Sequence, residues 1–333
     1  PVLLCGAAAV VSVAAGNVAV GAVVLVALIA LARRRGLPVA TPPRSVLLAL
    51  AALYVTHLLA TVLADPGPSR WDKLAEEMWL KLLLVAVPLV AAGRPRLVLA
   101  AVFATLAAGV VSAGYGLYQN AVGHDPWRDR PLFTTAGHAI ATSFHSHHLS
   151  YGGQMMLLLA MAMAWLRASV LDTVRRAWLP LLACVVLGLG LIVSFARSAQ
   201  LGAFAAAVLL VVTMPGRWRR AGMGALVAVL VLAAAMPAVR ERVIEGFTDE
   251  KEVTRPNLWR SSLAGIADRP LRGWGPGNFH HMLEAHEVPG FYESRAHSHD
   301  DYLMHAVNAG VPGLLAALWL LVATVRHLNA GWR

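Results

Sequence analysis

Charged residues are scarce in this 333-residue chain. Asp, Glu, Lys and Arg together make up 14% of it, whereas a typical soluble domain carries roughly 25%. Hydrophobic residues make up 58%, and the mean hydropathy is +0.62. A chain with so few groups for contact with water fits a protein that is solvated mostly by lipid. The composition therefore predicts a membrane protein.

Cysteine is also rare, and its two positions exclude a disulfide framework. Cys5 and Cys184 both lie within apolar segments, where neither is placed for a stabilising cross-link. No basic segment precedes the first apolar run and no cleavage-like stretch follows it, so residues 1–15 are interpreted as a membrane span and not as a signal peptide. Because Pro1 and not Met stands first, we expect a processed or trimmed N-terminus.

Long apolar segments recur along the chain and predict its fold class. A bilayer core requires about 20 mostly apolar residues per helix. The first two segments are short, are separated by Gly16-Asn17, and could form one bent element. We expect an all-α, polytopic bundle of transmembrane helices. Its spans are predicted near residues 1–15, 18–32, 45–64, 75–92, 96–118, 148–166, 178–195, 199–214, 222–238 and 302–325.

Arginines mark alternate connections between these spans. One set of loops contains fourteen arginines and a single acidic residue, Asp172. The positive-inside rule assigns that set to the cytoplasm, and the other set, with mixed charges, to the periplasm of a bacterial inner membrane. The fourteen arginines are Arg33, Arg34, Arg35, Arg44, Arg94, Arg96, Arg167, Arg175, Arg176, Arg217, Arg219, Arg220, Arg326 and Arg333.

The same distribution decides what the net charge of +10 means. Half of the 28 basic residues serve orientation and contact with anionic lipid headgroups. Membrane lipids are therefore expected partners, and nucleic acid is not. Lys81 is interpreted as the one charge well inside a span.

Residues 239–300 form the one long extramembrane segment. They contain many aromatic and apolar residues, which a disordered linker would lack. Helical spacing predicts a helix over 257–267 that ends at Asp268-Arg269-Pro270, followed by a glycine-rich turn. We expect a folded, partly helical periplasmic loop. The chain then divides into a helix bundle (1–238), this loop (239–300), and a final span with its tail (301–333).

Three arginines on the periplasmic side are candidates for binding phosphate. Arg197 lies in a tight turn between two spans, and Arg255 and Arg260 flank Trp259 in the loop helix. A guanidinium offers a planar fork to phosphate oxygens, so two of them could hold a diphosphate. Arg197 could instead extend to the membrane surface, and the loop arginines could form weak surface salt bridges with Glu250 or Glu252.

A histidine cluster closes the loop and continues into the last span. It comprises His297, Ser298, His299, Asp300, Asp301 and Tyr302, with His305 beyond. His-x-His beside carboxylates is compatible with zinc, but the spacing is unspecific. A histidine next to an aspartate at the start of a helix also suits a general base that a carboxylate orients.

These residues resemble a known family. His299-Asp300, nine residues, and then Gly310-Val311-Pro312-Gly313 are similar to the His-(Asn/Ser/Gln)-x9-Gly-x-x-Gly signature of O-antigen ligases. The segment from Arg255 to Leu303 resembles the core of the O-antigen ligase and polymerase superfamily. Asp300 departs from the usual Asn, Ser or Gln.

The resemblance implies a GT-C-like membrane glycosyltransferase without a cofactor or metal. It would transfer a glycan from undecaprenyl diphosphate to a hydroxyl of lipid A–core oligosaccharide, with inversion. The catalytic residues would be His299 as base, with His297 as the fallback, and Arg197 and Arg255 as the diphosphate clamp, with Arg260 third. The residues predicted to bind substrate are Arg260, His297, Asp300, Tyr302, Trp259 and, in the acceptor-lining loop before residue 151, His147.

Other functions remain open from the sequence. Within the family, the chain could polymerise O-antigen repeats or glycosylate pilin, because all three activities share the donor chemistry. Outside the class, it could transport a lipid-linked glycan. Transporters usually show repeats and broken helices at the membrane midplane, whereas the ionisable candidates here lie at the periplasmic edge. That placement favours an enzyme.

Overall fold

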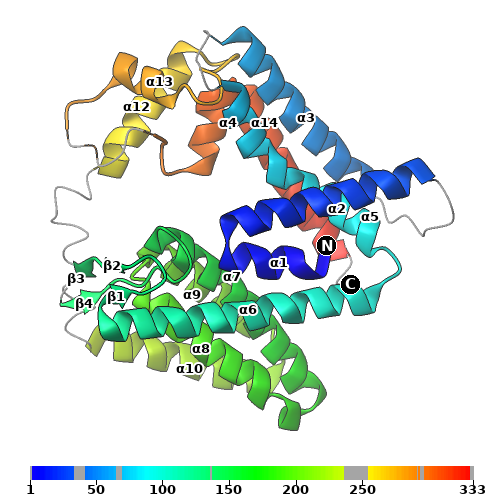
Figure 1. The fold of residues 1–333 in the computed structure, drawn as a ribbon, viewed down its shortest axis with the longest axis vertical. Helices are drawn as coiled ribbons and strands as arrows, with labels where there is room; N and C mark the ends of the chain where they lie inside the picture. The colour runs from blue at the N-terminus through cyan, green and yellow to red at the C-terminus, as the bar shows by residue number, and fades with distance from the viewer. Residues whose placement is uncertain are drawn as a thin grey trace. The chain divides into compact units, whose positions relative to one another are not determined.

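The fold is described from a computed structural model that covers residues 2–33, 42–64, 70–135, 137–235, 254–290, 292 and 296–330. The chain forms two compact units, which are treated separately here. Unit 1 comprises residues 1–38 and 90–240, and unit 2 comprises residues 39–89 and 241–333. Figure 1 shows their helices in the order of the chain.

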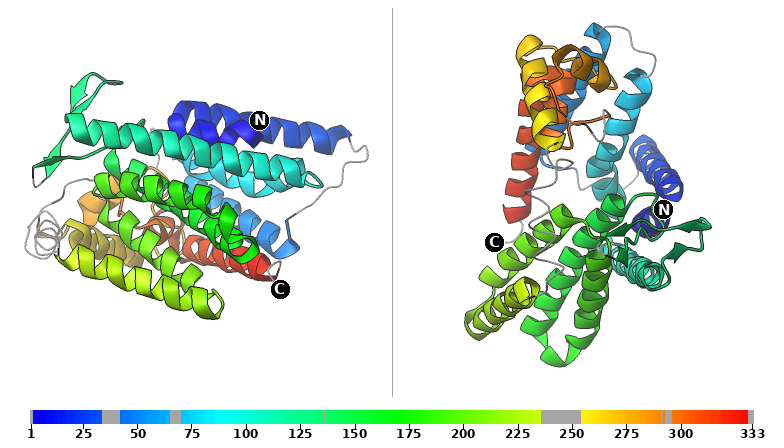
Figure 2. Two further views of the ribbon diagram at one scale, coloured as in Figure 1. Left: turned by 90° about the horizontal axis from the view of Figure 1, so that it is seen from below. Right: turned by 90° about the vertical axis from the view of Figure 1, so that its left-hand side faces the viewer.

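Unit 1 is a helical bundle with two small hairpins. Its helices α6, α7, α8 and α9 run alongside one another, as the further views in Figure 2 show. The helices are α1 (Val2–Val11), α2 (Val13–Arg33), α6 (Pro95–Val122), α7 (His148–Asp172), α8 (Trp178–Val193), α9 (Arg197–Val212) and α10 (Gly216–Ala235). The antiparallel hairpins pair β1 (His124–Asp125) with β2 (Arg130–Pro131), and β3 (Thr134–Thr135) with β4 (His138–Ala139).

Unit 2 combines apolar helices with the loop that carries the histidine cluster. The long helices α3 and α14 pack along each other around Ala49, Leu53 and Ala316. The elements are α3 (Arg44–Leu63), α4 (Arg70–Trp79), the 3-10 turn η1 (Leu80–Leu82), most of α5 (Leu83–Ala91), α12 (Thr254–Asp268), α13 (Phe279–His286) and α14 (Asp301–Ala330).

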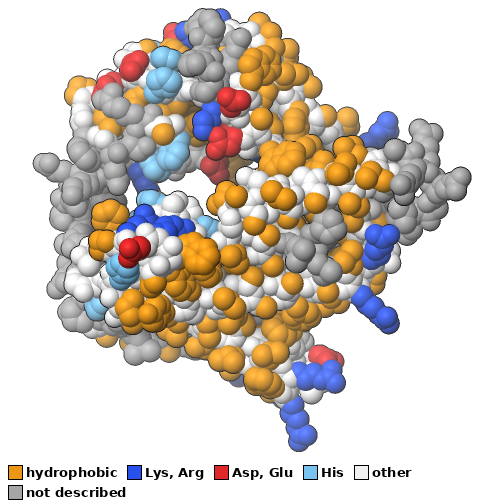
Figure 3. Space-filling view, in the orientation of Figure 1, with side chains coloured by type: hydrophobic (Ala, Val, Ile, Leu, Met, Phe, Trp, Pro, Cys, Tyr) orange, Lys and Arg blue, Asp and Glu red, His pale blue; other side chains and the backbone are white. Residues whose placement is uncertain are grey.

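Most predicted spans coincide with observed helices. Among the described residues, α3, α6, α7 and α14 are long and apolar enough to cross a membrane. Helices α8 and α9, and residues Val13–Ile29 of α2, are apolar but shorter. Large hydrophobic side chains face outward, for example Leu201 at 70% and Leu209 at 67% exposure. Figure 3 shows such side chains over much of the visible helical surface. The chain is therefore an all-α, multi-pass membrane protein.

Small residues bring the helices of unit 1 close together. A Cβ on Gly109 would overlap the Leu158 side chain at 2.6 Å, and one on Gly116 would overlap the Tyr151 hydroxyl at 2.2 Å. Tyr151 is fully buried in this core. In a membrane, where lipid competes with every apolar contact, close approach at glycine is a principal source of helix association. Gly109 and Gly116 of α6 thus have a packing role.

Two predicted boundaries were wrong. The break between the first helices lies at Ser12 and not at Gly16-Asn17, because α2 continues through those residues. Gly16 instead permits close packing, since a Cβ there would lie 2.9 Å from the Ala9 Cα of α1. The span predicted at 75–92 is also not one continuous helix: it contains parts of α4 and α5, joined by η1, and Lys81 lies in that 3-10 turn.

Candidate active site

Helix α14 is broken near its N-terminal end, at the glycine motif. Ala309 and Gly310 have non-helical backbone angles, and Gly310 has a φ of +67°. Pro312 follows and has no N–H to donate. The carbonyl of Asn308 therefore has no partner in a regular helix, and a glycine is needed where the chain reverses its backbone twist. The motif is a built-in helix break.

The glycine-rich turn of residues 270–277 fills this break with backbone hydrogen bonds. The Trp274 N–H donates to the Val307 carbonyl at 2.7 Å, and the Gly275 N–H donates to the Asn308 carbonyl at 2.9 Å. In return, the Val311 N–H donates to the Pro270 carbonyl at 2.7 Å. These bonds satisfy groups that would otherwise be left unpaired at the break. The turn and the helix form one structural element.

Two glycines make this close approach possible. Gly273 has a φ of +64°, and a Cβ there would lie 2.6 Å from the Asn308 carbonyl and the Gly310 nitrogen. A Cβ on Gly310 would lie 2.5 Å from the Pro270 carbonyl oxygen. The obstructing atoms are backbone and cannot rotate away. The Gly-x-x-Gly signature and the glycine-rich turn are thus two halves of one backbone contact.

His299 lies on a tight turn that immediately precedes α14. Its φ of +55° is unusual for a residue with a side chain. The neighbouring Ser298 is fully buried: its Oγ donates to the Asp300 carbonyl at 2.8 Å and its own carbonyl accepts from the Trp259 indole at 3.1 Å. These contacts hold the turn from both sides, so that the His299 side chain is exposed at a fixed point of the backbone.

The other predicted residues of this region surround the turn. The rings of His297 and His299 meet edge to face, with centroids 4.1 Å apart. One carboxylate oxygen of Asp300 accepts from the Leu303 N–H at 2.8 Å and thereby caps α14. Tyr302 is 48% exposed. The structure therefore brings His297, His299, Asp300 and Tyr302 together. The Asp300 carboxylate has a structural role, because it caps α14.

Arg255 and Arg260 lie on α12, the helix that also contributes Trp259. The predicted helix 257–267 is confirmed, with observed bounds Thr254–Asp268. It buries Leu258 against the Trp274 side chain and leaves both arginines exposed. Glu250 and Glu252, the alternative partners of these arginines, lie outside the described residues.

Arg197 begins helix α9 in unit 1. The predicted tight turn is confirmed: α8 ends at Val193, and Phe195 turns the chain with a φ of +52°. The Ser194 Oγ accepts from the Ala196 N–H at 3.2 Å and fixes the turn. The first N–H groups of a helix point outward and favour anions. Arg197 is half-buried beside them, so its cation and the helix dipole would act on the same ligand.

A buried carboxylate orders the loop between α6 and α7. Asp125 is fully buried and accepts from the Tyr115 hydroxyl at 2.8 Å and from the Arg128 guanidinium at 3.0 Å. Burial works to raise the pKa of the Asp125 carboxyl, but these hydrogen bonds outweigh burial and lower the pKa below its ordinary value. Gln119 adds bonds to the N–H groups of Thr142 and Ser143.

His147 ends this loop and caps α7. Its Nδ1 accepts from the Leu149 N–H at 3.2 Å, and its ring stacks on His148 with centroids 4.6 Å apart. Its predicted contact with substrate stays a prediction. His147 and Arg197 belong to unit 1, whereas the other predicted residues belong to unit 2.

Sequence reasoning named His305 and Lys81 but missed Glu77, Asn308 and His57, and it did not foresee the contacts of these side chains inside unit 2. Asn308 donates to both carboxylate oxygens of Glu77 at 3.0 Å, and the imidazoles of His57 and His305 are joined at 3.0 Å. Lys81 donates to the Glu77 carbonyl at 2.5 Å. The position of the Glu77 carboxylate within the predicted span 75–92 could have indicated that it has a polar partner. No described group of three or more His, Cys, Asp or Glu residues is arranged to hold a metal.

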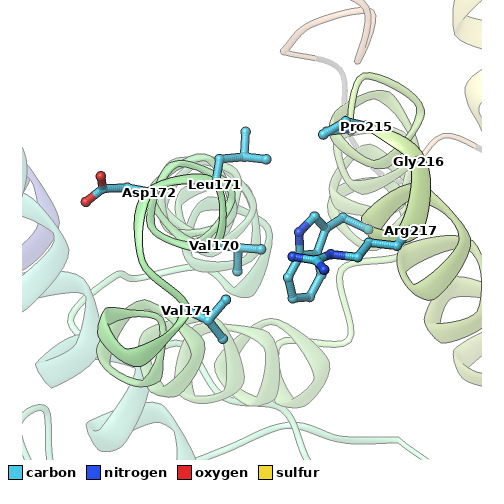
Figure 4. A pocket seen from close by; sticks show the side chains of 8 residues that line it. Val170, Leu171, Asp172, Val174, Pro215, Gly216 and Arg217 are labelled. Atoms are coloured by element: carbon cyan, nitrogen blue, oxygen red, sulfur yellow. The ribbon is translucent and has the colours of Figure 1, made fainter.

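A separate cleft of about 380 Å³ lies in unit 1, between the end of α7 and the start of α10 (Figure 4). Val170, Val174 and Trp218 form its apolar walls. The Arg217 guanidinium lies 5.2 Å from the centre of the Trp218 ring. None of the predicted site residues lines this cleft.

The described site thus has an exposed histidine on a fixed turn and two exposed arginines on α12, in a protein whose helices expose large apolar side chains. Residues 182–318 match the model of a family described as O-antigen ligase. The matched part is less than half of the chain. The match includes every predicted site residue except His147. No curated protein and no solved structure matches the chain.

Proposed function

We propose that the chain is an O-antigen ligase that transfers a glycan from undecaprenyl diphosphate to a hydroxyl of lipid A–core oligosaccharide. The observation that carries this proposal is the family match over residues 182–318, which includes both Arg197 and His299. The arginine-rich alternate loops support a reaction on the periplasmic face of the inner membrane. Both substrates are anchored in lipid, which suits an enzyme whose helices expose large apolar side chains.

His299 acts as the general base in this reaction. A sugar hydroxyl is a weak nucleophile, and removal of its proton in the transition state typically accelerates a reaction by about 10²–10⁴-fold. The oxygen then attacks the anomeric carbon as the bond to the diphosphate breaks, and the proton passes to the imidazole. The exposed His299 ring on a turn held by Trp259 and Ser298 suits this role. His297, in ring contact with it, is the fallback.

Arg197 and Arg255 stabilise the departing diphosphate, with Arg260 as the third candidate. Negative charge develops on the leaving group, and a fixed cation at such a position is worth a few kcal/mol, roughly 2.7–4. Arg197 stands at the start of α9 and the loop arginines are exposed on α12. Direct attack inverts the anomeric centre, and the lipid diphosphate as leaving group removes any need for ATP or a metal.

Ligation in a reconstituted mixture tests this proposal. The purified protein is mixed with undecaprenyl-diphosphate-linked glycan and lipid A–core, with EDTA present and no ATP. Wild type is compared with His299→Ala, Arg197→Ala and Arg255→Ala. The matched controls are His281→Ala, an exposed histidine on α13, and Arg96→Ala, an exposed arginine of a predicted cytoplasmic loop. Product from wild type and both controls, with little from the three site variants, is the expected result.

Three other results would redirect the assignment. Longer glycan chains on the carrier without transfer to lipid A–core would identify a polymerase. Transfer to pilin alone would identify a protein O-oligosaccharyltransferase. No glycan transfer of any kind would overturn the enzyme assignment in favour of a transporter for a lipid-linked glycan.

A further inference from the structure

The break in α14 is held by a polar pair, buried Asn308 and half-buried Glu77. Asn308, the last helical residue before the break, is only 1% exposed. Its Nδ2 lies 3.0 Å from each carboxylate oxygen of Glu77 on α4, a residue 231 positions away in the sequence. Polar groups within membrane helices are costly and are usually retained for a purpose. This pair fixes the residue on which the glycine-rich turn depends.

Asn308 joins two sets of contacts through different atoms. Its side chain donates to Glu77, and its backbone carbonyl accepts from the Gly275 N–H. A shift of Asn308 would therefore lengthen the bond to Gly275 directly. Its Oδ1 is buried and has no hydrogen-bond partner among the described atoms. With one side of the amide unsatisfied, the contact with the carboxylate is the main polar restraint on this side chain.

From Gly275 the contacts continue to the turn of His299. The neighbouring Trp274 donates its indole N–H to the Gly265 carbonyl of α12 at 2.9 Å. Arg269 covers the Trp274 ring at 3.8 Å from its centre. On the same helix, the Trp259 indole donates to the Ser298 carbonyl next to His299. Two indole hydrogen bonds, joined by α12, thus connect the 270–277 turn with the turn of His299.

We propose that Glu77 is a positioning residue: through Asn308 and the break in α14, its carboxylate sets the place of the 270–277 turn, of α12 and hence of His299. Glu77 does not contact the reacting atoms in this scheme. The effect on catalysis rests on the proposed ligase function, whereas the effect on the turn does not. A displacement of a catalytic group by about 1 Å typically costs on the order of 100-fold in rate.

The required property of Glu77 is a side-chain oxygen that accepts from Asn308 and not its charge. In Glu77→Gln, the amide oxygen still accepts from Asn308, and the new amide N–H can donate to the unsatisfied Asn308 Oδ1. Glu77→Leu keeps the size but removes both acceptors. If Glu77 acts by positioning, Glu77→Gln should keep the ligation rate that Glu77→Leu loses. A role for the charge itself predicts that both variants fail.

The first experiment measures kcat and KM in the reconstituted ligation for wild type, Glu77→Gln, Glu77→Leu and a control. The control is Glu76→Leu, the preceding residue, which is exposed and paired with Lys73 at 2.6 Å. We expect kcat to fall about 10- to 100-fold in Glu77→Leu, with KM for the donor unchanged. Glu77→Gln and Glu76→Leu should stay within about threefold of wild type. Equal loss in the Gln and Leu variants, or no loss in Glu77→Leu, overturns the proposal.

The second experiment needs no enzymatic activity. Hydrogen–deuterium exchange of the peptide that covers 270–277 is measured by mass spectrometry in the full-length protein. We expect faster exchange at Trp274 and Gly275 in Glu77→Leu but not in Glu77→Gln. If Glu77→Leu does not fold, Asn308→Ser replaces it, because the shorter side chain cannot reach Glu77. Unchanged exchange in the folded Leu or Ser variant overturns the proposal even if wild type transfers no glycan.

Discussion

The two units use polar residues in different ways. Unit 1 has a buried carboxylate in a loop between helices, where Asp125 accepts from Arg128 and orders the residues that lead to His147. Unit 2 places polar side chains within its helices, where Glu77 accepts from Asn308 beside a helix break. In the loop, charge organises a surface that water can reach. In the helices, hydrogen bonding fixes a backbone irregularity that lipid would not tolerate.

In the proposed chemistry His299 is the base and Arg197 is one of the cations that bind the leaving diphosphate. Replacement of His299 by Ala should produce the largest effect. We expect kcat to fall about 10²–10⁴-fold, because the hydroxyl loses its proton acceptor. The ligation assay measures this, with His281→Ala as the matched control. If His299→Ala stays near wild type while His297→Ala fails, the base is His297.

Replacement of Arg197 should test the contribution of unit 1. We expect Arg197→Ala to lower kcat about 10²–10³-fold through loss of a fixed cation at the leaving group. Arg197→Lys should recover part of that loss, since it restores the charge but not the planar fork. Both are measured in the same assay. Full activity in Arg197→Ala would leave the clamp to Arg255 and Arg260 in unit 2 alone.

The backbone contact in unit 2 should be sensitive to a single methyl group. Gly273→Ala places a Cβ against the Asn308 backbone and forces a side chain into a φ of +64°. We expect a loss of about 1–3 kcal/mol in the free energy of unfolding, measured by thermal denaturation in detergent. Gly153→Ala, in α7 of unit 1 with nothing within 4 Å of the added Cβ, should instead stabilise by about 0.5–1 kcal/mol. Equal effects would contradict the packing role of Gly273.

The charged loop of unit 1 should depend on pH. Because the pKa of Asp125 is lowered in the folded protein, its contribution is complete above the ordinary carboxyl pKa of about 3.9. It is lost as the pH falls through the folded value. We expect Asp125→Asn to cost about 1.5–3 kcal/mol near neutral pH, the usual range for a hydrogen bond to a charged group. In denaturation experiments the difference from wild type should shrink in acid; a constant difference would contradict this account.

Much of the fold could be predicted because it depends on local composition. Apolar length located α3, α6, α7 and α14, and helical spacing located α12. The turn before Arg197 was also evident, because polar residues interrupt two apolar runs. Such features need no knowledge of distant contacts.

The rest depends on contacts between residues far apart in the sequence. The span predicted at 302–325 contains a break at Gly310, although Gly310 and Pro312 were visible as parts of a family motif. Their structural meaning required the partner turn around Gly273. Likewise, Glu77 reads as one acid near the end of a span until Asn308 is placed beside it. The assignment of His299 came from resemblance and stays a prediction.

The break in α14 also bears on how the protein is inserted into the membrane. The carbonyls of Val307 and Asn308 accept hydrogen bonds from the N–H groups of Trp274 and Gly275, and in hydrocarbon an unsatisfied carbonyl costs several kcal/mol. The 270–277 turn precedes α14 in the chain and is therefore synthesised before it. The N–H groups of Trp274 and Gly275 are thus available before α14 is synthesised. The carbonyls at the break can therefore be hydrogen-bonded when α14 enters the membrane.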